Sequence, residues 1–180
     1  MDKLNQIAPM YDQMPKIVVL RGNSGCGKST VAKAFQKRLG EGTFLISQDY
    51  VRRDMLFVKD RPNNQAIELL KNLVTYGHKN CALTILEGIF YSDYYEGLFT
   101  LVKDLYASQV FAYYFDVPFE ETLERHKQKP NSHEFGAVEM KRWWRDKDHL
   151  PDICEKIIHK DTSADRVVEQ IFQDIKSSVI

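Results

Sequence analysis

Five short apolar runs divide the chain, and the segments between them have the spacing of amphipathic helices. The runs are rich in β-branched and aromatic residues, and polar residues do not alternate with them, which is typical of strands buried on both faces of a sheet. Strands are predicted at residues 16–21, 43–47, 81–86, 110–115 and 156–159.

Apolar residues in the intervening segments recur every three or four positions, as they do in helices that cover a sheet. Gly40 and Gly77 predict the ends of two of these helices. Helices are predicted at residues 31–39, 64–76, 94–106, 120–127, 140–147 and 163–176. Strands that alternate with helices predict an α/β fold of three layers around a five-stranded parallel sheet, with ligands at the carboxyl ends of its strands.

The length of 180 residues predicts a single domain, with residues 1–15 as an N-terminal arm before the first strand. Lys plus Arg and Asp plus Glu both number 25, so the formal net charge of zero gives no support to a protein that coats nucleic acid. A net charge of zero does not exclude a local basic groove on the surface. Three cysteines without paired spacing favour a cytoplasmic protein, and no apolar stretch predicts a membrane partner.

Residues 22–29 read G-N-S-G-C-G-K-S and fit the nucleotide phosphate loop G-x-x-x-x-G-K-S/T. The loop stands between a predicted strand and a predicted helix, as its mechanism requires. Lys28 is predicted to bind the β- and γ-phosphates of ATP and to act in catalysis, and Ser29 to bind Mg²⁺. The residues predicted to bind the nucleotide are Gly22, Asn23, Ser24, Gly25, Cys26, Gly27, Lys28, Ser29 and Thr30.

Two carboxylates follow predicted strands and are expected at the same edge of the sheet. Asp49 follows the second strand, with Arg52 three residues later. A carboxylate opposite the phosphate loop can accept the proton of an attacking hydroxyl, and an arginine beside it can hold a phosphate of the acceptor or the transferring group. The alternative is that Asp49 caps the next helix and that Arg52 is a solvated surface charge. Glu87 ends the third strand and is predicted to hold a Mg²⁺-bound water or to contact substrate, although a helix N-terminal charge is an equal alternative.

The loop together with the sequence D-x-x-R after the second strand resembles the P-loop kinases that phosphorylate hydroxyl groups. The nearest types are the 5′-hydroxyl polynucleotide kinases, the zeta toxins and chloramphenicol phosphotransferase. The resemblance covers most of residues 16–178, and it implies that Asp49 is the general base and that Arg52 contacts the acceptor.

The same resemblance implies a lid at about residues 119–148. In the family, lid arginines close over the triphosphate; Arg125 matches the first of them and is predicted to be catalytic, and Lys129 stands where a second is expected. A solvated helix with a surface pair between Glu121 and Arg125 is the alternative.

Aromatic residues near these segments leave two interpretations open. Trp143 or Trp144 either packs against the sheet, which we favour, or stacks on a ligand ring. The tyrosines after the third strand either line an acceptor pocket or belong to the core; they are Tyr91, Tyr94 and Tyr95.

The sequence thus predicts a kinase that binds ATP and Mg²⁺. The predicted acceptor is a hydroxyl of a small molecule, a nucleoside or a nucleic-acid 5′ end. Transfer to a phosphate, as in nucleoside monophosphate kinases, and a nucleotide-sensing NTPase without a separate acceptor are the alternatives. The sequence does not specify the oligomeric state.

Overall fold

The computed structural model describes residues 14–128 and 135–178, and most of the predicted N-terminal arm lies outside this range. Its centre is a parallel sheet of five strands in the order β2-β3-β1-β4-β5. All four neighbouring pairs are parallel, so the α/β prediction is confirmed. The strands are β1 (Lys16–Gly22), β2 (Thr43–Ser47), β3 (Leu83–Glu87), β4 (Val110–Asp116) and β5 (Glu155–His159).

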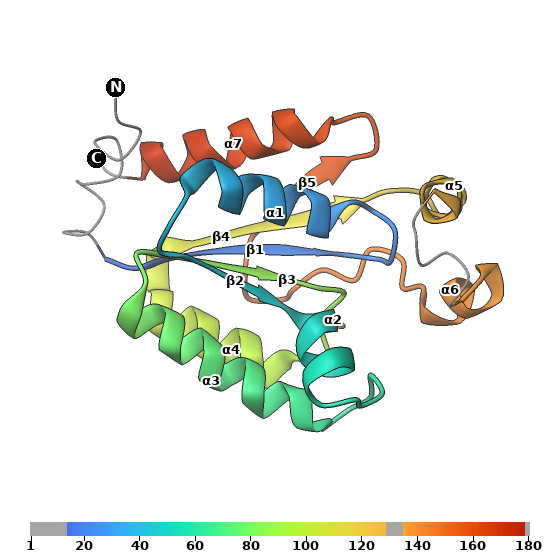
Figure 1. Ribbon diagram of the computed structural model, residues 1–180, viewed down its shortest axis with the longest axis horizontal. Helices are drawn as coiled ribbons and strands as arrows, with labels where there is room; N and C mark the ends of the chain where they lie inside the picture. The colour runs from blue at the N-terminus through green and yellow to red at the C-terminus, as the bar shows by residue number, and fades with distance from the viewer. Residues whose placement is uncertain (1–13, 129–134, 179–180) are drawn as a thin grey trace.

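Helices cover both faces of the sheet, which gives the three predicted layers (Figure 1). One face packs against α1 (Lys28–Leu39) and α7 (Ala164–Ser177), and the other against α3 (Gln65–Asn80) and α4 (Glu96–Tyr106). Every residue of β1 is buried, because this central strand is covered from both sides. None of the helices in the described ranges is long and apolar enough to cross a bilayer.

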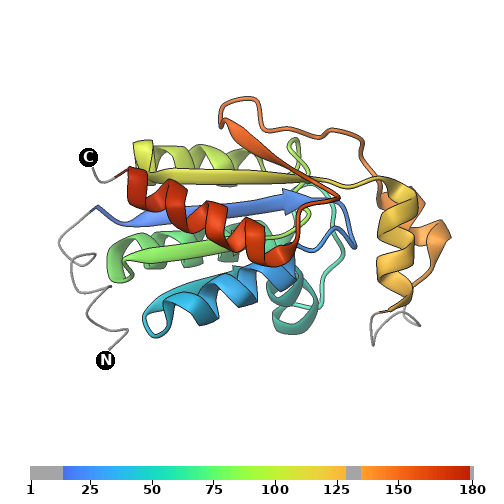
Figure 2. The same cartoon turned by 90° about the horizontal axis from the view of Figure 1, so that it is seen from above.

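Except for one 3-10 helix at the start of β4, the shorter helices of the described residues lie beyond the carboxyl ends of the strands. Helix α2 (Gln48–Tyr50) and the π-helix η3 (Val51–Met55) follow β2 directly, and the short 3-10 helix η4 (Ala107–Gln109) precedes β4. Helices α5 (Phe119–Lys127) and α6 (Ala137–Trp143) lie beyond the carboxyl ends of the strands, in the segment predicted as a lid (Figure 2).

Two predicted helix ends are wrong. Gly77 lies inside α3, which continues to Asn80. A Cβ at Gly77 would lie 2.3 Å from Oγ1 of Thr84, so this glycine permits close packing of the helix on β3. The helix predicted at residues 140–147 begins at Ala137 and ends at Trp143, because the backbone is already extended at Trp144.

A fully buried cation, Arg21, lies near the end of β1, where the sequence pattern indicated only an apolar strand. Its Nη1 donates to both carboxylate oxygens of Glu155, at 2.9 and 3.0 Å. Its Nη2 donates to Asp148 at 3.2 Å, and Nε and Nη2 both donate to the carbonyl of Phe90. The side chain therefore joins three segments that are remote in sequence.

Replacing Arg21 by Met should lower the free energy of unfolding by about 3–5 kcal/mol, because Glu155 and Asp148 lose the cation that compensates their burial. Lys37→Met, at an exposed position of α1, serves as the control and should change it by less than about 0.5 kcal/mol. Urea unfolding followed by circular dichroism measures both variants. Equal stability of the two variants would mean that the Arg21 cluster contributes nothing.

Candidate active site

The phosphate loop connects β1 to α1 and packs against α5. Gly25 has a φ of +85°, and a Cβ there would lie 2.8 Å from the carbonyl oxygen of Thr122 in α5, so the loop requires glycine at this position. Lys28 begins α1 and is almost completely buried; its Nζ donates to the carbonyl of Asn23 at 2.9 Å. The start of α1 points its N–H groups and its positive dipole end toward the loop.

A chain of three polar side chains connects this loop to the ends of two strands. The Ser29 hydroxyl donates to Glu87 Oε2 at 3.0 Å, and the Ser47 hydroxyl donates to Glu87 Oε1 at 2.5 Å. Glu87 is buried at the end of β3. A hydroxyl and a carboxylate are oxygen ligands of the type that Mg²⁺ accepts, directly or through water, so these residues fit a magnesium ion beside the loop.

Asp49 lies two residues beyond Ser47, in α2. Its Oδ1 accepts a hydrogen bond from Arg52 Nη2 at 2.8 Å and lies 3.5 Å from Nε of Arg53. The Asp49 side chain is 49% exposed, whereas Arg52 is buried and also donates to the carbonyl of Val58. The N-cap of α2 is Ser47, so Asp49 does not cap this helix.

Gln48, Asp60 and Tyr95 form a polar group, in which Gln48 and Tyr95 are fully buried and Asp60 is partly exposed. The carboxylate of Asp60 accepts from the Tyr95 hydroxyl at 2.7 Å and from Nε2 of Gln48 at 3.2 Å. Burial raises the pKa of Asp60, and the Tyr95 hydrogen bond and the Arg52 charge oppose that rise. Within the described residues, Oε1 of Gln48 and Nε of Arg52 have no hydrogen-bond partner.

Arg125 extends from α5 across the phosphate loop. It donates to the carbonyl of Cys26 at 3.3 Å and to the carbonyl of Lys160 at 3.0 Å, and it pairs with Glu121 at 2.8 Å. A cavity of about 350 Å³ adjoins it and is lined by the loop, by Gln128 and by the segment that joins β5 to α7. The predicted pair with Glu121 exists, but Arg125 is not merely a solvated residue, because it also holds the loop.

The aromatic residues of the lid pack mainly on one another. Trp143 contacts Phe135 with ring centroids 5.2 Å apart, and Trp144 contacts Phe119 at 5.1 Å. The prediction that a tryptophan packs on the sheet is therefore wrong. The Phe135 ring also lies 5.6 Å from the Arg53 guanidinium, so the lid approaches η3. Lys129 lies outside the described residues.

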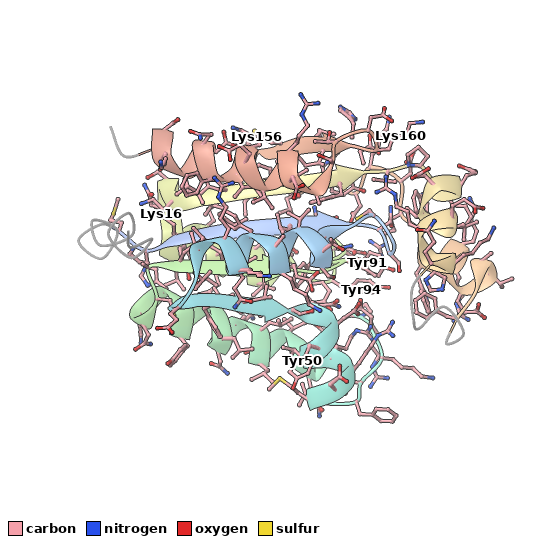
Figure 3. All side chains as sticks on the ribbon, turned by 45° about the horizontal axis from the view of Figure 1, so that its top comes forward. Lys16, Tyr50, Tyr91, Tyr94, Lys156 and Lys160 are labelled. Carbon is pink, nitrogen blue, oxygen red and sulfur yellow. The ribbon has the colours of Figure 1, made fainter. Side chains whose placement is uncertain are left out.

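Arg145 was not predicted as a site residue, although it belongs to a segment that mixes basic and aromatic residues. Its guanidinium lies 4.1 Å from the ring centre of Tyr91 and 4.8 Å from that of Tyr94. Both tyrosines lie at the carboxyl edge of the sheet, facing α5 and α6 (Figure 3). Burial raises the pKa of Tyr91 to about 12, with Asp60 adding to the rise and Arg145 opposing it.

The structure thus brings together most of the predicted site residues. Around the loop lie Lys28, Ser29, Glu87 and Arg125, and Asp49 and Arg52 follow β2, which β3 separates from β1. Tyr95 belongs to the core, Tyr94 packs against the same core while partly exposed, and the largely buried Tyr91 contacts Arg145. The core interpretation is confirmed for Tyr95, and an acceptor pocket lined by tyrosines stays a prediction.

The sequence matches the family described as AAA domain over residues 17–150, which is most of the chain. The chain therefore belongs to this family, and its fold is that of a P-loop NTPase. No curated protein matches the sequence significantly.

Solved structures share the fold at low sequence identity. An APS kinase from Mycobacterium tuberculosis, in complex with AMPPNP and APS, has a TM-score of 0.62 at 20% identity, over 91% of this chain and 98% of its own. A gluconokinase from Sinorhizobium meliloti has a TM-score of 0.60 at 13% identity, over 92% and 94%. A shikimate kinase from Acinetobacter baumannii, in complex with shikimate, has a TM-score of 0.60 at 16% identity, over 94% and 98%.

Lys28→Ala should weaken MgATP binding about 10–100-fold, since a hydrogen bond to a charged group contributes about 1.5–3 kcal/mol. Lys33→Ala, on the exposed side of the same helix, should bind MgATP like the wild type. Isothermal titration calorimetry measures both affinities. Unchanged affinity in the Lys28 variant would show that this loop does not bind the nucleotide.

Proposed function

We propose that the protein is an ATP-dependent kinase that transfers the γ-phosphoryl group to a hydroxyl of a small molecule. The observation that carries this proposal is the place of Asp49. The hydroxyl of Ser29 in the phosphate loop and the hydroxyl of Ser47 both donate hydrogen bonds to the Glu87 carboxylate. Asp49 follows Ser47 by two residues. A half-exposed carboxylate therefore follows β2, two strands along the sheet from the phosphate loop, with an arginine beside it.

The nucleotide side of the site supplies binding and charge neutralisation. The loop amides, the N-terminus of α1 and Lys28 would hold the phosphates, and the cavity beside Arg125 would hold the nucleoside part. Arg125 already contacts the loop through the Cys26 carbonyl, so a small change of its side chain brings a second cation to the transferring group. A bound Mg²⁺, held near Ser29 and Glu87, would neutralise charge on the phosphates.

On the acceptor side, Asp49 acts as the general base. It accepts the proton of the acceptor hydroxyl while the hydroxyl oxygen forms a bond to the γ-phosphorus, and the bond from that phosphorus to the β–γ bridging oxygen breaks to release ADP. Arg52 orients the carboxylate through the 2.8 Å hydrogen bond and contacts the acceptor. Positioning and electrostatics carry most of such a reaction, because phosphoryl transfer needs little covalent help from the protein.

The structural neighbours support a small acceptor. Their names describe kinases of gluconate, APS and shikimate, which are small molecules that carry hydroxyl groups. Zero net charge also favours a small molecule, a nucleoside or a short 5′ end over a long nucleic acid, because a long phosphate footprint demands a basic surface.

A screen with ATP labelled in the γ-phosphate tests the proposal. The panel contains sugar acids, sugar alcohols, nucleosides, dinucleotides with a free 5′-hydroxyl and nucleoside monophosphates. We expect label on a hydroxyl oxygen of at least one acceptor. Transfer only to the phosphate of nucleoside monophosphates, or hydrolysis of ATP with no acceptor labelled, would refute the proposal.

Asp49→Asn should reduce transfer by about 10²–10⁴, the range for loss of a general base, and should keep the affinity for ATP within a few fold. Asp54→Asn is the matched control, because Asp54 is exposed on the adjoining π-helix. Single-turnover rates and calorimetry separate the two effects. An equal loss of ATP affinity in the Asp49 variant would assign this carboxylate to nucleotide or metal binding instead.

Arg125→Ala should lower kcat by more than it raises the KM for ATP, because a contact that strengthens in the transition state affects the rate. Lys127→Ala, on the exposed side of α5, should leave both constants unchanged. Steady-state kinetics over a range of ATP concentrations distinguish the two outcomes. A rise in the KM for ATP alone would limit Arg125 to ground-state binding.

A further inference from the structure

Asn23 in the phosphate loop holds the segment that returns from the lid. Its Nδ2 donates to the carbonyl of Arg145 at 2.7 Å, and its Oδ1 accepts from the backbone N–H of Arg145 at 3.1 Å. Both halves of the amide are thus used by one residue 122 positions away. The Asn23 side chain imitates a peptide group of a neighbouring strand, and only an asparagine amide offers a donor and an acceptor at this reach.

The Arg145 side chain is ordered by its aromatic neighbours. Its guanidinium packs on Tyr91 and Tyr94, whose rings are themselves in edge contact at 5.2 Å. The Tyr91 hydroxyl donates to the carbonyl of Trp143 at 2.7 Å, which fixes the chain two residues before Arg145. Backbone and side chain of Arg145 are therefore both held in place before any ligand binds.

The guanidinium keeps one edge open. Nη1 pairs with the exposed carboxylate of Asp93, and 32% of the Arg145 side chain is exposed. Nε and Nη2 of Arg145 donate no hydrogen bond to any residue that the structure describes. Two adjacent N–H donors on one edge match the two oxygens of a carboxylate, a phosphate or a sulfate.

We infer that Arg145 binds an oxyanion on the acceptor, and that Asn23 is a positioning residue that sets this arginine relative to the phosphate loop. The inference rests on the proposed kinase function and names the acceptor class: a small alcohol that also carries a carboxylate, phosphate or sulfate group. Asn23 is thus part of the phosphate loop in sequence, while its side chain positions the arginine that binds the acceptor.

Matched acceptors test the oxyanion. Sugar acids are compared with the corresponding sugar alcohols, and 3′-nucleotides with their nucleosides, so that the two arms separate carboxylate from phosphate. Arg145→Ala should raise the KM of the oxyanion-bearing member of the active pair about 10–100-fold, which corresponds to one charge-assisted contact. The KM values of the neutral member and of ATP should stay within about twofold. An unchanged KM for both anionic members would overturn the inference.

A double-mutant cycle tests Asn23. Asn23→Ala should raise the KM of the anionic acceptor several fold with the KM of ATP unchanged, and it should have no further effect in the Arg145→Ala background, since both changes remove one interaction. Asp146→Asn, exposed in the same segment, is the control. Additive effects, or a matching rise in the KM of ATP, would show that Asn23 does not act through Arg145.

A second measurement keeps the inference separate from the kinase proposal. The chain has two tryptophans, Trp143 and Trp144, directly before Arg145, so their fluorescence reports binding without turnover. Titration with a sugar acid and with a 3′-nucleotide should give a Kd that both Arg145→Ala and Asn23→Ala raise about 10-fold or more. If the wild type phosphorylates no hydroxyl, this result still supports the oxyanion site. Equal Kd values in wild type and variants would overturn it whether or not the protein is a kinase.

Discussion

The position of the segments around the site depends on the hydrogen bonds and ion pairs of the buried Arg21 guanidinium. A fully buried cation is tolerated only where every donor finds a partner, and Arg21 finds them in Glu155 of β5, in Asp148 and in the carbonyl of Phe90. Asp148 in turn accepts from the backbone and the hydroxyl of Ser92. The segment that follows β3 and the segment that returns from the lid are thus fixed to β1. Few other arrangements would satisfy the same charges, so this network specifies geometry even where its net contribution to stability is small.

Two kinds of constraint position the groups around the phosphate loop. Asp49 and Arg52 are set by local chain geometry, because they share one short helical segment immediately after β2 and lie three residues apart. Arg52 lies in the π-helix, so the wider turn of this helix also helps to set its position relative to Asp49. Such π-helical turns are common at functional sites. Arg145 is set by tertiary contacts, through Asn23 and Tyr91. Asp49 and Arg52, on one side of the proposed acceptor site, are therefore positioned by residues close to them in sequence. Arg145, on the other side, is positioned by its contact with the phosphate loop.

The sequence predicted the sheet, its parallel sense and the phosphate loop because these features have short-range signatures. Apolar runs identify strands buried on both faces, and the glycine spacing identifies the loop. It failed where a contact with a different element decides the outcome. Gly77 continues α3 because of its packing on Thr84, and Trp143 packs on Phe135 within the lid. The clamp between Asn23 and Arg145 could not be predicted either, since no local pattern pairs residues that are 122 positions apart. The resemblance to polynucleotide kinases, zeta toxins and chloramphenicol phosphotransferase stays a prediction at the level of subtype.

The division of labour in the site follows from these constraints. The loop glycines and Lys28 are restricted by the shape of a triphosphate, which is the same for every kinase that uses ATP. The side chain of Arg145 has no such restriction, because only the backbone of this residue is hydrogen-bonded to Asn23 while the side chain packs on Tyr91. A substitution at residue 145 can therefore change the charge beside Tyr91 without changing the two hydrogen bonds that hold the segment. In the proposed acceptor site, the preference for an anionic acceptor would therefore depend on one side chain that a fixed backbone carries.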